Sequence, residues 1–250
     1  MSRSIRTALM AAAFGLSLAG AVYAAPSTAV TAALADPARL PAEKTRDADR
    51  KAAEVLEFSG LKPGDKVADI FPGGGYYTHI FSKVVGPKGL VWAVQTSPPK
   101  PSPTALGTDT AYPNIKLAVQ PWDKFAPAEK LDVIFNSQFH HDLYNPEYGA
   151  QGGGEAGVIR VTKAFYDALK PGGVYIIIDH AGRAGTGHSE FNTLHRIEEP
   201  EVKKLVEGVG FKLVGESKVL ENPADPKDKN VFDPSIRGKT DQFILKFRKP

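Results

Sequence analysis

Apolar residues occur in short runs along the chain, and turn residues separate one run from the next. These runs predict strands at 67–71, 90–94, 115–119, 131–135, 174–178, 211–219 and 243–247. Apolar positions with helical spacing predict helices at 43–61, 77–84, 158–169 and 200–209. Strands that alternate with helices favour a three-layer α/β domain with a mostly parallel sheet.

The most informative stretch is Asp69-Ile70-Phe71-Pro72-Gly73-Gly74-Gly75-Tyr76-Tyr77. It predicts a strand, a tight glycine turn and the N-terminus of a helix. Glycines allow a ligand to approach the backbone closely, and the free N–H groups of a helix start favour a polar or anionic group. Asp69 can reach a polar group of a ligand beside that turn. We therefore expect a nucleotide-like cofactor at the carboxyl end of the first strand.

The first residues have the pattern of an export signal. Arg3 and Arg6 precede an apolar stretch at 8–19, and small residues at 22–24 offer a cleavage site. The alternative is a membrane anchor, for which this stretch is short and rich in Ala and Gly. We expect residues 1–24 to be a signal peptide, 25–42 a flexible leader and 43–250 one domain. The mature protein would then be periplasmic or secreted, without a stable membrane anchor.

Composition excludes several kinds of chemistry. The chain has no Cys, which rules out disulfides, thiol catalysis and Cys-ligated zinc. Two of the positive charges behind the net charge of +3 lie in the predicted signal, and no basic block stands out, so nucleic acid is not an expected partner. His180, His188 and His195 have spacings that match no standard zinc pattern, so the sequence predicts no metal site.

Three segments, in the order in which they occur along the chain, resemble motifs of the class I S-adenosylmethionine-dependent methyltransferases. Residues 69–75 resemble the first motif, an acid with three alternating glycines, with Phe71 in place of the first glycine. Residues 85–94 resemble the link into the second strand, and 169–174 the turn into the fifth. The resemblance covers 43–250 and is closest to exported bacterial predicted methyltransferases.

The fold that this resemblance implies is Rossmann-like, with seven strands and an antiparallel last strand between the fifth and the sixth. Two rival nucleotide folds fit less well. A dinucleotide-binding fingerprint needs a glycine where Thr78 stands, and the lysine and hydroxyl residue of a phosphate-binding P-loop are missing after the glycines.

The resemblance implies S-adenosyl-L-methionine as the cofactor and a set of residues to bind it. Asp69 would orient the methionine end, Gln95 would replace the usual acid on the ribose hydroxyls, and Asp123 would bond the adenine amine. Trp122 is a candidate to pack on the purine, with core packing as an equal alternative. The implied cofactor-binding residues are Asp69, Gly73, Gly75, Tyr76, Gln95, Trp122 and Asp123.

The acceptor side is expected after the fourth strand. Asn136 ends that strand, and 136–139 loosely match the N-P-P-Y signature of the family without its prolines. His141 is a candidate general base if the acceptor is a hydroxyl, as is His140, and a supporting role for either stays open. The candidate catalytic residues are therefore Asn136 and His141. Four tyrosines are candidates for the wall of an acceptor pocket: Tyr76, Tyr77, Tyr144 and Tyr148.

The resulting hypothesis is transfer of a methyl group from S-adenosylmethionine to a small-molecule nucleophile. An exported, non-catalytic binding or scaffolding protein that retains the fold is the alternative, and Phe71 and Gln95 favour it. A third possibility is a hydrolytic or redox reaction in the same pocket, for which His141 and His180 would matter.

Overall fold

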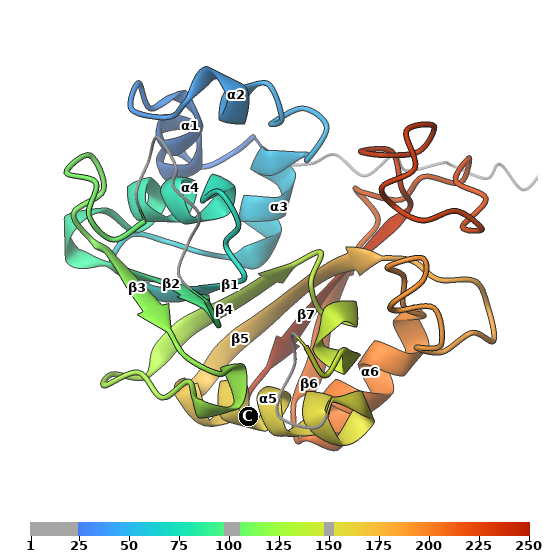
Figure 1. The fold of residues 1–250 in the computed structure, drawn as a ribbon. Helices are drawn as coiled ribbons and strands as arrows, with labels where there is room; N and C mark the ends of the chain where they lie inside the picture. The colour runs from blue at the N-terminus through green and yellow to red at the C-terminus, as the bar shows by residue number, and fades with distance from the viewer. Residues whose placement is uncertain (1–24, 98–105, 148–152) are drawn as a thin grey trace, which may run out of the picture.

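The computed structural model describes residues 25–97, 106–147 and 153–250. Its centre is one seven-stranded sheet with the order β3-β2-β1-β4-β5-β7-β6 (Figure 1). The strands are β1 (Lys66–Ile70), β2 (Leu90–Gln95), β3 (Ile115–Val119), β4 (Leu131–Ser137), β5 (Leu169–His180), β6 (Lys212–Ser217) and β7 (Gln242–Arg248). Each overlaps the range that the apolar pattern predicts, although β5 begins five residues before its predicted start at 174 and includes the expected turn at 170–173.

β7 runs antiparallel to both of its neighbours, β5 and β6, whereas the pairs among β1 to β5 are parallel. This arrangement confirms the predicted fold, including the position of the last strand. The chain order reverses between β1 and β4, which lie side by side at the centre of the sheet. Ligands of open α/β sheets bind at such a reversal, beyond the carboxyl ends of the strands.

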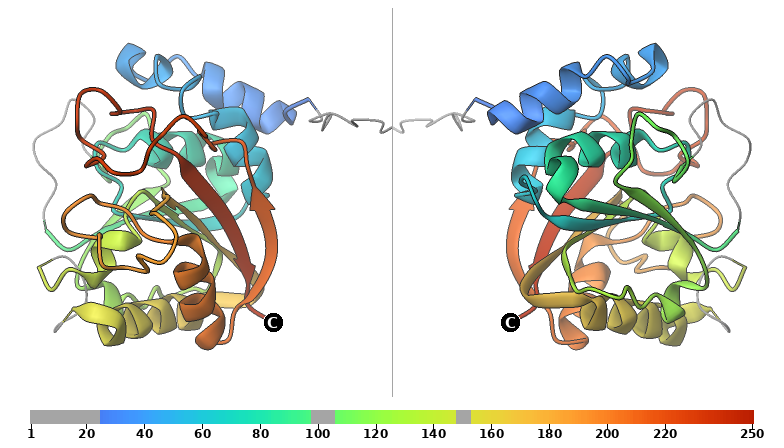
Figure 2. Two further views of the ribbon diagram at one scale, coloured as in Figure 1. Left: turned by 90° about the vertical axis from the view of Figure 1, so that its right-hand side faces the viewer. Right: turned by 90° about the vertical axis from the view of Figure 1, so that its left-hand side faces the viewer.

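Helices cover both faces of the sheet and complete three layers (Figures 1 and 2). On one face lie α1 (Thr28–Ala35), α2 (Pro41–Lys44), α3 (Ala52–Ser59) and α4 (Tyr76–Val85). On the other face lie α5 (Gly154–Ala168) and α6 (Glu199–Gly208). Short 3₁₀ turns form η1 (Gly86–Lys88), η2 (Trp122–Lys124) and η3 (His141–Tyr144). Each face of the sheet therefore has its own apolar core.

The N-terminal region differs from the prediction in two ways. Residues 25–42, expected as a flexible leader, contain α1, whose Val30 and Ala33 are buried in the core beside α4. The helix expected at 43–61 is interrupted, because Lys51 has a left-handed backbone (φ 47°). Asp47 in the interrupted segment accepts hydrogen bonds from Arg39 and Tyr76, which fixes the chain there in a non-helical course.

Two further predictions lie outside the described residues. These are the signal peptide at 1–24 and Tyr148 of the long loop after β4. Within the described ranges, no helix is long and apolar enough to cross a membrane.

Candidate functional site

Two adjoining cavities lie over the carboxyl ends of β1, β4 and β5. One has a volume of about 560 Å³ and the other about 280 Å³. Both are lined by Arg46, Arg50, Tyr77, Ser137, Gln138, His180, Val231 and Phe232. The shared lining makes them two parts of one hollow, at the place where the sheet order predicts a ligand.

Asp69 lies in the smaller cavity, near the end of β1. Its side chain is almost fully buried, and Oδ2 accepts a hydrogen bond of 2.6 Å from the Thr78 hydroxyl on α4. Burial raises the pKa of Asp69 to about 7, although the hydrogen bond from Thr78 and the charges of His79 and Arg50 oppose the rise. A carboxyl in this state gains from a cationic group placed beside it.

The glycine turn offers its backbone to the same cavity. A Cβ added at Gly73 or Gly74 would meet nothing within 4 Å, and both residues line the smaller cavity. Gly75 differs from the expectation, because a Cβ there would lie 2.7 Å from His79 and 2.8 Å from Leu106. Gly75 is therefore required by packing, while Gly73 and Gly74 leave room for a ligand.

The expected ribose and adenine residues stand apart from the two cavities. Gln95 ends β2, and its side-chain Nε2 is buried without a hydrogen-bond partner. Trp122 is fully buried, and Asp123 beside it on η2 is partly exposed. None of these three lines the two cavities. Tyr76, in contrast, lines the smaller cavity and donates its hydroxyl to Asp47 at 2.7 Å.

Phe71 has a local structure that is unusual for its residue type. Its φ is +57°, the left-handed region where the family motif has glycine and where a bulky side chain is strained. The ring stacks on Phe139 with centroids 4.2 Å apart and meets the edge of Trp122 at 6.4 Å. These contacts hold an aromatic cluster together, although Phe71 remains 46% exposed.

Asn136 and His140 point into the protein. Both are completely buried, and both contact the hydroxyl of Tyr175, at 3.2 Å from Asn136 Nδ2 and 3.4 Å from His140 Nδ1. Burial lowers the pKa of His140 to about 4, so this ring is neutral at physiological pH. Neither residue lines the described cavities, so the predicted acceptor role of Asn136 gains no support from its position.

His141 is placed differently, because it lines the smaller cavity and is bonded to Asp179 at the end of β5. The Nδ1 of His141 lies 2.7 Å from Asp179 Oδ1, and the His141 backbone N–H donates to Oδ2 at 2.7 Å. Burial alone would lower the pKa of His141, but the adjacent carboxylate outweighs it and raises that pKa. Asp179 therefore fixes both the ring and the backbone of His141.

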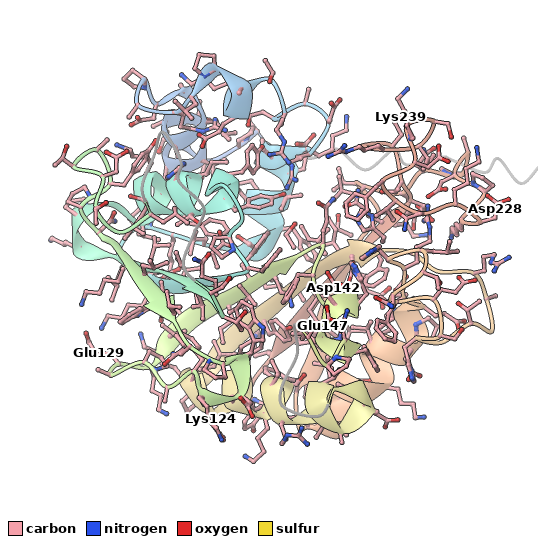
Figure 3. All side chains as sticks on the ribbon, viewed as in Figure 1. Lys124, Glu129, Asp142, Glu147, Asp228 and Lys239 are labelled. Atoms are coloured by element: carbon pink, nitrogen blue, oxygen red, sulfur yellow. The ribbon has the colours of Figure 1, made fainter. Side chains whose placement is uncertain are left out.

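Beside His141 the structure places two groups that sequence spacing did not bring together. Asp142 and His195 lie against its Nε2, and all three residues line the smaller cavity. Figure 3 labels Asp142 on η3, next to the carboxyl ends of β4 and β5. His180 and His188, which the sequence analysis weighed with His195 as metal ligands, have other partners. His180 bonds Thr240, and His188 lies 3.1 Å from Glu201.

Sequence reasoning also missed two arginines of the hollow, Arg46 and Arg50. Arg46 and Arg50, from the turn between α2 and α3, line both cavities, and Arg237 lines the larger one. Arg50 lies over the rings of Tyr76 and Tyr77, at 4.8 and 5.5 Å from their centroids. No sequence motif marks Arg46 or Arg50, and only the packing of α3 beside the sheet brings them to the site.

The comparisons with known proteins agree with this fold. The family model for protein-L-isoaspartate(D-aspartate) O-methyltransferase matches residues 21–100. A protein-L-isoaspartate O-methyltransferase from Ignicoccus hospitalis is 27% identical over 147 residues, which make up 56% of this chain and 59% of that protein. The chain thus spans less than two thirds of this curated relative.

Solved structures extend the likeness to most of the chain. A SAM-dependent methyltransferase from Aquifex aeolicus is 21% identical, with a TM-score of 0.52 over 78% of this chain and 87% of that one. A possible exported protein from Bordetella parapertussis is 16% identical, with a TM-score of 0.51 over 85% and 71%. The sheet order and these likenesses show that the chain has the fold of the class I S-adenosylmethionine-dependent methyltransferases.

Proposed function

We propose that this protein transfers a methyl group from S-adenosylmethionine to an acidic small-molecule acceptor. The observation that carries the proposal is the pairing of a buried carboxyl, Asp69, with the open backbone of Gly73 and Gly74. The pair lies in a cavity where the order of the strands reverses. The family model and the neighbours of similar fold support the same cofactor.

The residues present fit this cofactor at two separate points. Asp69 would hold the cationic methionine end, because its carboxyl is buried beside an open glycine turn. Gln95 lies outside the two cavities and would bind a ribose hydroxyl through Nε2, which is buried and has no partner among the described residues. An unsatisfied buried donor costs about 1–3 kcal/mol, and a hydrogen bond to the oxygen of a ribose hydroxyl would remove that cost.

When bound, the cofactor supplies a methyl group on a sulfonium, whose sulfur keeps the bonding electron pair as the acceptor's lone pair forms the new bond. The leaving group is thus already activated. The chain has to hold the acceptor in line with the methyl group and exclude water. His141 lines the smaller cavity with Asp69 and is held rigidly by Asp179, so it is placed to contact the acceptor.

The charge of the larger cavity supports an acidic acceptor. Arg46, Arg50 and Arg237 line it, while Asp49 is its one acidic residue among those described. None of these arginines forms an ion pair with a carboxylate in the part of the chain that the structure describes. Guanidinium groups recognise carboxylates through paired hydrogen bonds, and the name of the Ignicoccus relative specifies O-methylation of isoaspartate. A carboxylate-bearing acceptor fits both observations.

We also propose that the protein acts outside the cytoplasm. The charged, apolar and small-residue order of residues 1–24 supports export, and the Bordetella protein of similar fold is described as possibly exported.

Calorimetry with S-adenosylhomocysteine tests the cofactor assignment. Asp69→Ala should weaken binding by about 1–3 kcal/mol, because it leaves the ligand's cationic group unpaired in a buried site. Asp65→Ala is a matched control, since Asp65 is also buried but lies at the opposite end of β1. Equal binding by wild type and Asp69→Ala, or no binding by either, would favour the binding or scaffolding alternative, which Phe71 in the glycine position otherwise supports.

A further inference from the structure

Three potential metal-ligand atoms converge on one point of the smaller cavity. The Nε2 of His141 lies 3.2 Å from the Nδ1 of His195. The Oδ1 of Asp142 lies 3.5 Å from the first of these nitrogens and 3.4 Å from the second. Atoms bound at about 2.0–2.2 Å to one ion lie roughly 2.8–3.1 Å apart in octahedral geometry and roughly 3.3–3.6 Å apart in tetrahedral geometry. The three separations lie close to the tetrahedral range without any movement of the side chains.

Asp179 orients His141 as a ligand. Its carboxylate accepts hydrogen bonds from the backbone N–H groups of His141 and His180, at 2.7 and 2.8 Å. As an acceptor it also determines the tautomer of the His141 ring, because Nδ1 at 2.7 Å must carry the proton. In the neutral ring, Nε2 then presents its lone pair to the cavity. Metal-binding histidines are oriented by carboxylates in this way.

His195 is held in place by its neighbours in the chain. Arg196 is fully buried and forms a two-bond ion pair with Asp225, and the N–H of Ile197 donates to the carbonyl of His180. Between these anchors and Leu194, His195 itself adopts φ +55°. A left-handed non-glycine residue costs about 1–3 kcal/mol, and such strain is concentrated at functional sites.

A simple hydrogen bond between the two histidines explains only part of the cluster. It would account for the 3.2 Å contact, with His195 Nδ1–H donating to His141 Nε2. It would leave Asp142 Oδ1 as it stands, buried and without a hydrogen-bond partner. An unsatisfied buried carboxylate oxygen is costly, whereas a cation shared by all three atoms satisfies it.

We propose that His141, Asp142 and His195 bind one divalent first-row transition-metal ion. Two imidazoles and one carboxylate on one side of the ion leave the remaining coordination positions open toward the cavity, as in mononuclear catalytic sites. The borderline-hard donor set selects for zinc, iron(II), manganese or cobalt rather than for thiophilic ions.

The proposed metal site extends the proposed function. The catalytic role of the metal site rests on that function. A cation at the three ligands would bind an oxygen of the acidic acceptor and fix it in the cavity that also contains Asp69. His141 would then act on the acceptor through the ion rather than as a base. Binding of the ion itself does not depend on that role.

The test is a zinc titration of the full chain, purified with a tag that contains no histidine and freed of metal with a chelator. Calorimetry with zinc chloride alone should give one equivalent. His195→Ala and Asp142→Asn should weaken binding at least about 10–100-fold, the range found when even a supporting group is lost, and Asp179→Asn should fall in that range. His188→Ala is the matched control, because that histidine lies outside the cluster beside Glu201 and Tyr144.

Cobalt(II) absorption gives a second readout, since loss of His195 should alter the visible bands while loss of His188 should not. Absence of zinc binding by a wild type that unfolds cooperatively would overturn the proposal, as would equal binding by His195→Ala and wild type. S-adenosylhomocysteine calorimetry in chelator separates the two conclusions. Cofactor binding without zinc binding rejects only the metal site, and zinc binding without cofactor binding rejects only the methyltransferase assignment.

Discussion

The Asp69→Asn substitution should make the protein more stable and a weaker binder of the cofactor. Asparagine keeps the size of the side chain and an oxygen that can accept the 2.6 Å hydrogen bond from Thr78. It removes only the buried charge. If the substitution raises stability and weakens binding, Asp69 is retained for its ligand. Substitution of a purely structural residue would lower both stability and binding.

The magnitude follows from the pKa of this carboxyl. Burial raises the pKa of Asp69 to about 7, while the unfolded chain has an Asp pKa of about 3.9. The folded state therefore binds the proton more tightly, and this stabilising contribution is complete below about pH 4 and lost as the pH rises through about 7. A difference of roughly three pKa units corresponds to about 4 kcal/mol at most.

Urea unfolding at several pH values measures this difference. The variant should gain stability relative to wild type by roughly 1.4 kcal/mol per pH unit between about pH 4 and pH 7, with a plateau above. The charged groups that face Asp69 are His79 and Arg50, and both remain in the variant. A difference between the two proteins that does not change with pH, or a variant that is less stable at pH 8, would refute this reasoning.

Three further predictions concern Phe71, the acceptor cavity and export. Phe71→Gly should change the free energy of unfolding by no more than about 1–2 kcal/mol, because relief of the left-handed φ offsets the lost stacking on Phe139. It should also tighten S-adenosylhomocysteine binding if the ring crowds the cofactor, and weaker binding in calorimetry would contradict that view. Arg237→Ala should raise KM for a carboxylate acceptor with little change in kcat, measured by methyl transfer against the exposed control Arg183→Ala, and an unchanged KM would argue against an acidic acceptor. N-terminal sequencing of the mature protein should begin near Ala25, and an intact Met1 in a membrane fraction would contradict export.

The sequence predicts the fold well because its signals are local. Each strand is an apolar run between turn residues, and the glycines after Asp69 mark the ligand end of β1 without any tertiary information. The same local reading missed the interruption before α3, where Lys51 is left-handed and Asp47 is bound by Arg39 and Tyr76. Contacts between distant residues overrode helical spacing at that point.

The arrangement of residues on the acceptor side depends on contacts between distant parts of the chain, which the spacing of residues in the sequence does not predict. His141 and Asp179 follow neighbouring parallel strands, β4 and β5, so their proximity was available from the predicted sheet order. His195 comes from a loop with no periodic pattern, and its position depends on the buried Arg196–Asp225 pair. Asn136 stands at a strand end as predicted, but its side chain turns inward to Tyr175.

A crystal structure with S-adenosylhomocysteine would show whether the cofactor binds at Asp69 and the glycine turn. We expect the ammonium group of the ligand on Asp69, its backbone contacts at Gly73 and Gly74, and its sulfur facing the His141 side of the cavity. A ligand bound elsewhere, or a cavity that stays empty in crystals grown with millimolar ligand, would contradict the assignment of this site to the cofactor.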